Sequence, residues 1–164
     1  MKLELIDIFS NSGAVSEFEG DMNFGEISEL SVSFEGPVHI KGRAENIGGQ
    51  VEISAHITGK IAANCARCMK DIFKDVDFEF TERIAGKDTE IVDTDDIILL
   101  DGSEVDIAEL TLNNFITVSP MKYLCKEDCK GLCPNCGADR NQTDCKCDEN
   151  AIDPRLDVLN NLFR

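Results

Sequence analysis

Residues 51–84 read VEISAHITGKIAANCARCMKDIFKDVDFEFTERI and decide the fold of this 164-residue chain. Apolar side chains recur with a spacing of two on both sides of the CARC motif: Val51, Ile53, Ala55, Ile57, Ile61 and Ala63 before it, and Ile72, Val76, Phe78, Phe80 and Ile84 after it. Alternation of this kind is typical of half-buried β-strands. The stretch therefore predicts a long antiparallel hairpin that has Cys65 and Cys68 at its tip.

The residues before this hairpin predict one further long strand. Alternation begins at Leu30 and continues through Val32, Phe34, Val38 and Ile40, and the pair Gly36–Pro37 predicts a bulge or an edge position. AENIGGQ, at 44–50, predicts the turn, so that three adjacent strands form an antiparallel meander. At the start of the chain, residues 1–9 predict a strand and 11–13 a turn, whereas 14–29 are expected to be loop and short extended pieces.

The residues after the hairpin predict one helix. Residues 86–96 are polar and are expected to form a loop before the short apolar run 97–100. Asp106 can cap a helix, with Glu109 reaching back, and Pro120 ends it. The fold class predicted is α+β: mainly an antiparallel β-sheet or a partly open barrel, with one packed helix and a C-terminal cysteine-rich zinc-binding segment.

This pattern divides the chain into two parts. Residues 1–119 are expected to form a β-rich core, with the helix at about 106–118, and 120–164 a cysteine-rich metal-binding segment that ends in a short helix. For that last helix, Asp153 supplies a cap and Pro154 suits the first turn. The helix is expected to dock on the core, and the alternative is an apolar anchor for a partner.

The segment 125–147, CKEDCKGLCPNCGADRNQTDCKC, holds six of the eight cysteines. In CPNCG, Pro134 fixes one backbone angle and Gly137 permits a positive φ, so that Cys133 and Cys136 can point their sulfurs at one ion. A cysteine cluster of this density favours a metal site over disulfides or redox-active thiols.

Eight thiolates suffice for two four-coordinate zinc sites. The spacing favours a local site made by Cys133, Cys136, Cys145 and Cys147, which leaves a second set of four ligands: Cys65, Cys68, Cys125 and Cys129. The alternative is one zinc ion drawn from the six C-terminal cysteines, with Cys65 and Cys68 structural. The sequence thus predicts one or two Zn²⁺ per chain.

The net charge of −16 comes from 16 basic and 32 acidic residues. Residues 120–147 carry a net +1 and the rest of the chain −17, so diffuse binding to a nucleic acid backbone is disfavoured. Local RNA or partner contact is expected from the basic residues near the cysteines: Arg67, Lys122, Lys126, Lys130, Arg140 and Lys146. The N-terminal residues lack an uninterrupted apolar run, so they are expected to be neither a signal peptide nor a membrane anchor. The sequence therefore predicts a cytoplasmic protein.

Two histidines, His39 and His56, lie off the apolar alternation. A turn centred near residue 47 would set them roughly opposite each other, where they could bind a metal or a phosphate. Without a third ligand, a solvent-exposed role is favoured. No catalytic residues are predicted, because the sequence offers no serine, histidine and acid arrangement and no phosphate-binding glycine loop.

Taken together, these motifs resemble the YceD-like family, the large ribosomal RNA subunit accumulation proteins. The resemblance rests on CARC, the segment 125–147 and the closing DPRLDVL, in this order. It implies a cytosolic, non-enzymatic factor needed for large-subunit ribosomal RNA to be processed or to accumulate.

Two functional hypotheses follow. In the first, the zinc-ordered element contacts ribosomal RNA. In the second, the chain is an acidic protein-interaction or holdase module that binds a basic ribosomal protein without touching RNA. A thiol-redox enzyme is a distant third. Neither a membrane nor a small-molecule substrate is expected as a partner.

Overall fold

The computed structural model describes residues 1–87 and 97–147. Within them lie nine strands and two helices: β1 (Lys2–Glu4), α1 (Ile6–Ser10), β2 (Val15–Met22), β3 (Glu26–Ile27), β4 (Val32–Phe34), β5 (Val38–Ile47), β6 (Gln50–Asn64), β7 (Asp71–Gly86), β8 (Ile97–Leu100), β9 (Glu104–Asp106) and α2 (Ile107–Val118). Most of the predicted loop at 86–96 and the whole predicted C-terminal helix lie outside the described residues.

The β6–β7 hairpin is the long axis of the main sheet, as the alternation predicts. The two strands pair from Val51↔Ile84 to Asn64↔Asp71. Two strands, β5 and β4, pair with the other edge of β6, one after the other. The break between them contains Gly36, whose φ of 81° is a backbone conformation that glycine adopts without strain. The meander is therefore confirmed, whereas the position predicted as a bulge or an edge at Gly36–Pro37 is a break that divides the expected single strand into β4 and β5.

The turn between β5 and β6 is shorter than predicted. Pairing continues to Ile47↔Gln50, so only Gly48 and Gly49 form the turn, with φ values of 64° and 89°. Two successive positive φ angles suit a tight hairpin turn that matches the twist of the strands. The resulting register pairs His39 with Thr58 and His56 with Lys41, so the expected opposition of the two histidines is wrong.

Two predictions for the first 29 residues are wrong in part. The stretch 14–29, expected to be loop and short extended pieces, contains the short β3 but also the eight-residue β2, which pairs along its whole length with β5. Phe18 is its one buried side chain, so the alternation is too weak to read from sequence. The expected strand over 1–9 ends at Glu4, and α1 follows it. The side-chain amide of buried Asn46 donates to the α1 carbonyls of Ile8 (2.7 Å) and Phe9 (3.1 Å), which stabilises this turn of helix.

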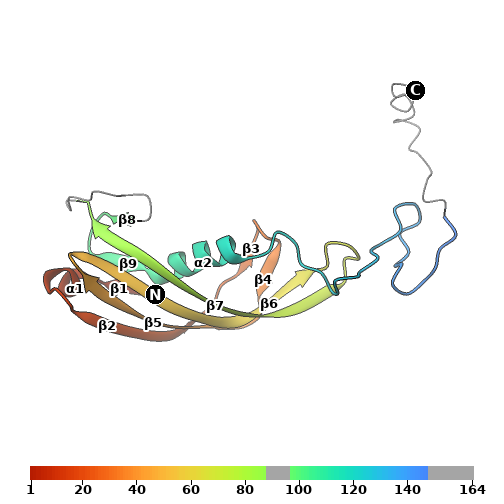
Figure 1. Cartoon of the computed structure of the whole chain (residues 1–164). Helices are drawn as coiled ribbons and strands as arrows, with labels where there is room; N and C mark the ends of the chain where they lie inside the picture. The colour runs from red at the N-terminus through yellow and green to blue at the C-terminus, as the bar shows by residue number, and fades with distance from the viewer. Residues whose placement is uncertain (88–96, 148–164) are drawn as a thin grey trace, which may run out of the picture.

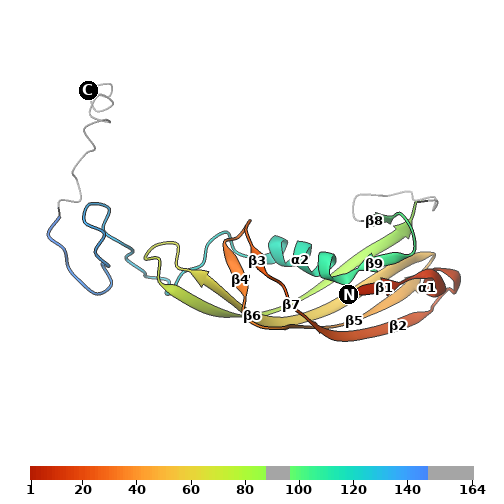
Figure 2. The same cartoon turned by 180° about the vertical axis from the view of Figure 1, so that it is seen from behind.

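Helix α2 lies against the concave side of the curved sheet (Figure 1, Figure 2). Its predicted start is confirmed, because the Asp106 carboxylate accepts a hydrogen bond from the Ala108 amide at 2.9 Å. Phe115 packs on the sheet, with its ring centroid 4.9 Å from that of Phe34 and 6.0 Å from that of Phe78. These contacts join the helix to the apolar face of the sheet.

The architecture is thus α+β with a mostly antiparallel sheet. The sheet does not close into a barrel, and β8 adds the parallel pairing with β7. The tip of the β6–β7 hairpin and the chain after α2 meet at the end of the sheet opposite α1 (Figure 1). No helix among the described residues has both the length and the apolar character needed to span a bilayer.

Candidate metal centre

Four cysteines meet at the hairpin tip, here defined as residues 65–70. Cys65 and Cys68 come from the tip, and Cys125 and Cys129 from the segment after α2; we call the four the inner cysteine group. Their sulfur atoms all lie within 4.8 Å of one another, with Cys65 and Cys129 3.8 Å apart and Cys68 and Cys125 3.7 Å apart. A tetrahedral ion with Zn–S bonds of 2.3 Å requires sulfurs about 3.8 Å apart.

Backbone hydrogen bonds hold the tip and the segment together on both sides of these sulfurs. The Ala66 amide donates to the Tyr123 carbonyl at 2.9 Å, and the Leu132 amide donates to the Arg67 carbonyl at 3.0 Å. Gly131 lies so close to the backbone of the tip that a Cβ atom added to it would be 2.9 Å from the Arg67 carbonyl oxygen. The inner group is therefore a joint between segments far apart in the sequence.

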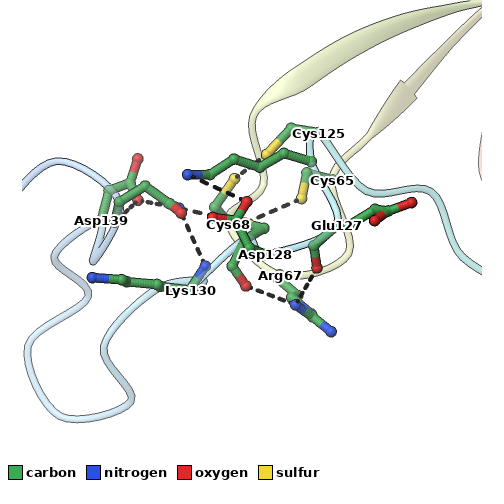
Figure 3. Close-up of polar contacts among 11 residues, drawn as sticks. Cys65, Arg67, Cys68, Cys125, Glu127, Asp128, Lys130 and Asp139 are labelled. Carbon is green, nitrogen blue, oxygen red and sulfur yellow. Dashed lines mark hydrogen bonds and ion pairs between the residues drawn. The ribbon is translucent and has the colours of Figure 1, made fainter.

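The Arg67 side chain reinforces this joint (Figure 3). Its guanidinium donates to the carbonyl of Cys129 at 2.8 Å and to that of Glu127 at 3.2 Å. Arginine suits this position because several donors project from one planar group. The CARC motif thus supplies two sulfurs and the donor that orders the loop carrying Cys129.

The other four cysteines, Cys133, Cys136, Cys145 and Cys147, form the outer cysteine group. Their sulfurs also lie within 4.8 Å of one another, but Cys133 is buried while Cys136 is exposed. The Gly137 amide donates to the Cys133 carbonyl at 2.8 Å, and Gly137 has a φ of 72°, as the CPNCG turn predicts. The outer group is formed within one short stretch of chain.

Asn141 connects the two groups, a role that the sequence does not predict. It lies between Cys136 and Cys145 of the outer group, yet its side-chain amide donates to the Cys129 sulfur of the inner group at 3.4 Å. Its carbonyl oxygen accepts from the Lys130 amide at 2.9 Å, and Asp139 accepts from its backbone and side-chain nitrogens. An Asp-x-Asn pattern suggests a turn, but nothing in it points to a sulfur twelve residues away.

The electrostatics of both groups suit a cation. A hydrogen bond from the Cys125 backbone amide lowers the pKa of Cys65 to about 6, and one from Cys136 does the same for Cys133. Burial is the main cause that raises the pKa of Cys125 to about 12, and the neighbouring sulfurs add to it. The pKa of Cys147 is also raised to about 12, mainly by the Cys136 side chain. In each group the sulfurs of lowered pKa thus oppose ionisation of their neighbours, and a bound cation relieves that opposition.

The donor sets fit a thiophilic metal ion: each has four sulfurs within 4.8 Å of one another, and the two inner pairs given above lie at the separation that a tetrahedral ion requires. A disulfide requires sulfurs about 2.05 Å apart, far closer than the inner pairs. The structure brings together the two sets of four that the spacing predicts. The alternative of one ion from six C-terminal cysteines leaves the meeting of the CARC pair with Cys125 and Cys129 unexplained.

The predicted contact residues lie around these groups in different settings. The Arg67 guanidinium donates hydrogen bonds to the carbonyls of Cys129 and Glu127, as described above. The ammonium group of Lys126 lies 3.6 Å from the carboxylate of Asp128. Lys130 and Arg140 line a hollow of about 460 Å³ beside Cys145. Lys122 and Lys146 are exposed. Hydrogen bonds from Asn141 lower the pKa of Asp139, and the charge of Lys70, at the exposed end of the tip, adds a smaller effect in the same direction. The sequence alone does not predict that Lys70 lies near this loop.

The histidines lie on the polar face of the sheet and away from the cysteines. His39 is 2.9 Å from Asp21 and 3.3 Å from Glu19, and His56 is 2.8 Å from Asp77. Both side chains are 45% exposed, in line with the solvent-exposed role that the sequence favours.

The family comparison covers this whole joint. The model of the family described as "Large ribosomal RNA subunit accumulation protein YceD" matches residues 53–163, which include all eight cysteines. No solved structure matches the chain.

Relatives are found in two groups of bacteria. The uncharacterized protein YlbN of Bacillus subtilis is 26% identical over 151 residues, which make up 90% of this chain and 88% of YlbN. The uncharacterized protein Rv2926c of Mycobacterium tuberculosis is 26% identical over 98 residues, 58% of this chain, and the match spans about half (47%) of that relative. With the family match extending over more than half of its length, the chain belongs to the YceD family of large ribosomal RNA subunit accumulation proteins.

Proposed function

We propose that the chain is a non-enzymatic, cytoplasmic factor that supports processing or accumulation of large-subunit ribosomal RNA, with one structural zinc ion in each cysteine group. The observation that carries the proposal is the inner group, where four sulfurs within 4.8 Å of one another join the hairpin tip to the segment after α2. Family membership supports the ribosomal part of the proposal.

Zinc at these sites would be structural. All four positions of each site would be filled by thiolates, which leaves no open position for a water molecule or a substrate. The described part of the cysteine-rich segment, residues 120–147, contributes few side chains to the main apolar core. A structural zinc ion can add about 10 kcal/mol to the folding of such a segment. Cys65, Cys68, Cys125 and Cys129 would hold one ion, and the outer four cysteines the other.

We also propose that the chain consists of a core, 1–119, and a metal-ordered segment, 120–164. Chelation would then release the segment while the core keeps its fold. Limited proteolysis with and without a chelator tests this division: trimming should begin after residue 120, and loss of the core at the same rate would contradict it.

RNA contact is proposed for the surface around the two groups. Lys122, Lys130, Arg140 and Lys146 are the candidates there, and Lys126 and Arg67 lie beside them. Direct phosphate contacts release counterions, so the affinity for a large-subunit RNA fragment should fall steeply with salt. Replacing Lys130 and Lys146 by glutamine should reduce that salt dependence.

Depletion of the protein from its own cells tests the function. Mature large-subunit ribosomal RNA should fall relative to small-subunit RNA, and precursors should rise. The native chain should restore the ratio, and a Cys65→Ser, Cys129→Ser chain should restore it poorly. An unchanged ratio after depletion would overturn the proposal.

A second candidate function is that of an acidic module that binds a basic ribosomal protein without RNA contact. It is favoured by one observation, the charge of −16, most of which lies outside the cysteine-rich segment. RNA binding that stays unchanged when the basic residues are replaced would favour this candidate.

A further inference from the structure

A row of side chains crosses four strands on the polar face of the sheet, near the hairpin tip. Ser33 of β4 pairs with Glu26 of β3 on one side and with Ala62 of β6 on the other, and Ala62 pairs with Phe73 of β7. The two central residues are small. A hollow of about 410 Å³ opens here, which we call the Phe73 groove.

The aromatic side chain in this groove is unusually open to solvent. Phe73 is 67% exposed, although it lies in a strand whose other aromatic residues, Phe78 and Phe80, pack towards the core. Its neighbours in the row, Ala62 and Ser33, are too short to cover the ring. A large apolar side chain beside a hollow marks a surface that a partner can cover.

The charges around the ring are of one sign. Three carboxylates line the groove, Glu26, Glu35 and Asp71, and no lysine or arginine is among its lining residues. In the described part of the chain, none of the ion pairs involves these three residues. The nearby Lys60 lies 3.9 Å from Asp75 instead. The groove thus offers an open ring and carboxylates without a cation of their own.

We propose that the Phe73 groove binds an arginine- or lysine-rich extended segment of a protein partner. A guanidinium or ammonium group can lie over the aromatic ring while the carboxylates on either side neutralise it. The inference deepens the function proposed above and rests on it, since it gives an assembly factor a basic protein client.

Other occupants fit the groove less well. An RNA strand would bring phosphates close to three carboxylates, which is unfavourable. A second copy of the chain would bring another net charge of −16. The chain's own residues 148–164 carry four acidic and two basic residues, so their charge also opposes the carboxylates.

The test is a binding titration of the full-length protein with a fluorescent decapeptide of alternating arginine and glycine. Phe73→Ala should weaken binding about 2- to 30-fold, the range expected for loss of a cation–π contact. Phe73→Trp, which keeps an aromatic face, should retain it. The double variant Glu26→Gln, Glu35→Gln should also weaken binding.

Matched controls separate the groove from the general acidity of the chain. Val15→Ser removes another exposed apolar residue, and Glu4→Gln, Glu17→Gln removes the same charge elsewhere. Both should leave peptide binding within twofold of the native protein. Circular dichroism should show the native fold for each variant, because all the replaced side chains are exposed.

Three results would overturn the assignment. These are equal losses in the groove and control variants, unchanged peptide binding after Phe73→Ala, and a loss in Phe73→Ala of binding to single-stranded RNA but not to the peptide. The proposed function fails separately. If depletion leaves the large-subunit RNA unchanged while peptide binding still requires Phe73, the groove stands and the ribosomal role does not.

Discussion

The side-chain amide of Asn141 donates a hydrogen bond to the sulfur of Cys129, with Nδ2 and Sγ 3.4 Å apart. Asn141 lies in the loop of the outer cysteine group, whereas Cys129 belongs to the inner one. A donor aimed at a sulfur stabilises its thiolate form, which is the form that binds a metal. Order in the outer loop therefore assists the inner group.

Replacement of Asn141 should weaken the inner site. We expect Asn141→Ala to lower its zinc affinity about 10- to 100-fold, as loss of a hydrogen bond to a ligand commonly does. Competition with a chromogenic chelator measures this. Thr143→Ala, an exposed change in the same loop, is the control. Equal affinities in Asn141→Ala and the native chain would show that the hydrogen bond contributes nothing.

Metal content should respond separately to changes in the two groups. We expect two zinc ions per native chain, one after Cys65→Ser and one after Cys145→Ser, because each group needs four thiolates. Elemental analysis of protein purified without added metal gives the count. A Cys65→Ser protein that still holds two ions would contradict the partition.

Two glycines with the same backbone conformation should differ in their tolerance of alanine. Gly131 has a φ of 74° and Gly137 one of 72°, so an added Cβ costs about 1–2 kcal/mol at either. At Gly131 the Cβ would also lie 2.9 Å from the Arg67 carbonyl oxygen, whereas at Gly137 it meets nothing within 4 Å. Gly131→Ala should therefore lose zinc at a lower temperature than Gly137→Ala, as measured by zinc release on heating.

Replacement of two phenylalanines by alanine should affect the free energy of unfolding very differently, because one is buried and the other is exposed. Phe115 is 3% exposed and packs between α2 and the sheet, so Phe115→Ala should lower the free energy of unfolding by about 3–5 kcal/mol. Phe73 is 67% exposed, and Phe73→Ala should change it by less than about 0.5 kcal/mol. Urea denaturation of zinc-loaded protein measures both. Comparable losses would mean that Phe73 is part of the core.

The Asp106 cap should contribute to stability in a pH-dependent way. Burial raises the pKa of its carboxyl group, but the Ala108 amide and the Met1 ammonium outweigh burial, so the folded-state pKa lies below its usual value. A lowered folded-state pKa gives stability that is present above the unfolded-state pKa of about 3.9 and is lost as the pH falls through the folded-state pKa.

Asp106→Asn isolates this contribution. Asparagine keeps the oxygen that caps the helix, so the loss at pH 7 should be less than about 1 kcal/mol. The difference from the native chain should begin to shrink below about pH 4 and disappear once the pH falls below the folded-state pKa. Thermal unfolding across pH, with Asp7→Asn as an exposed control, measures it. A difference that grows towards low pH would contradict the sign of the pKa shift.

Much of the fold is readable from local patterns. The alternation through Val51 and Ile84 gave the central hairpin, and Asp106 gave the start of α2, because each depends on neighbours in the sequence. The strand β2 could not be read, since Phe18 is its one buried side chain and its pairing with β5 supplies the rest of its order. The helix α1 depends on the distant Asn46 in the same way.

The candidate metal centre also combines local features, which can be read from the sequence, with long-range contacts, which cannot. By itself the sequence determined the CARC tip, the CPNCG turn and the number of thiols, because a turn and a ligand spacing are properties of a few consecutive residues. The spacing left two groupings of the cysteines open, and only the tertiary structure brings Cys129 beside Cys65, 64 positions away. Only the tertiary structure, too, decided that Asn141 reaches the Cys129 sulfur and that Phe73 lies open beside Ala62 and Ser33. These relationships depend on strand register and on the path of the chain after α2, which are set by contacts summed over the whole sheet.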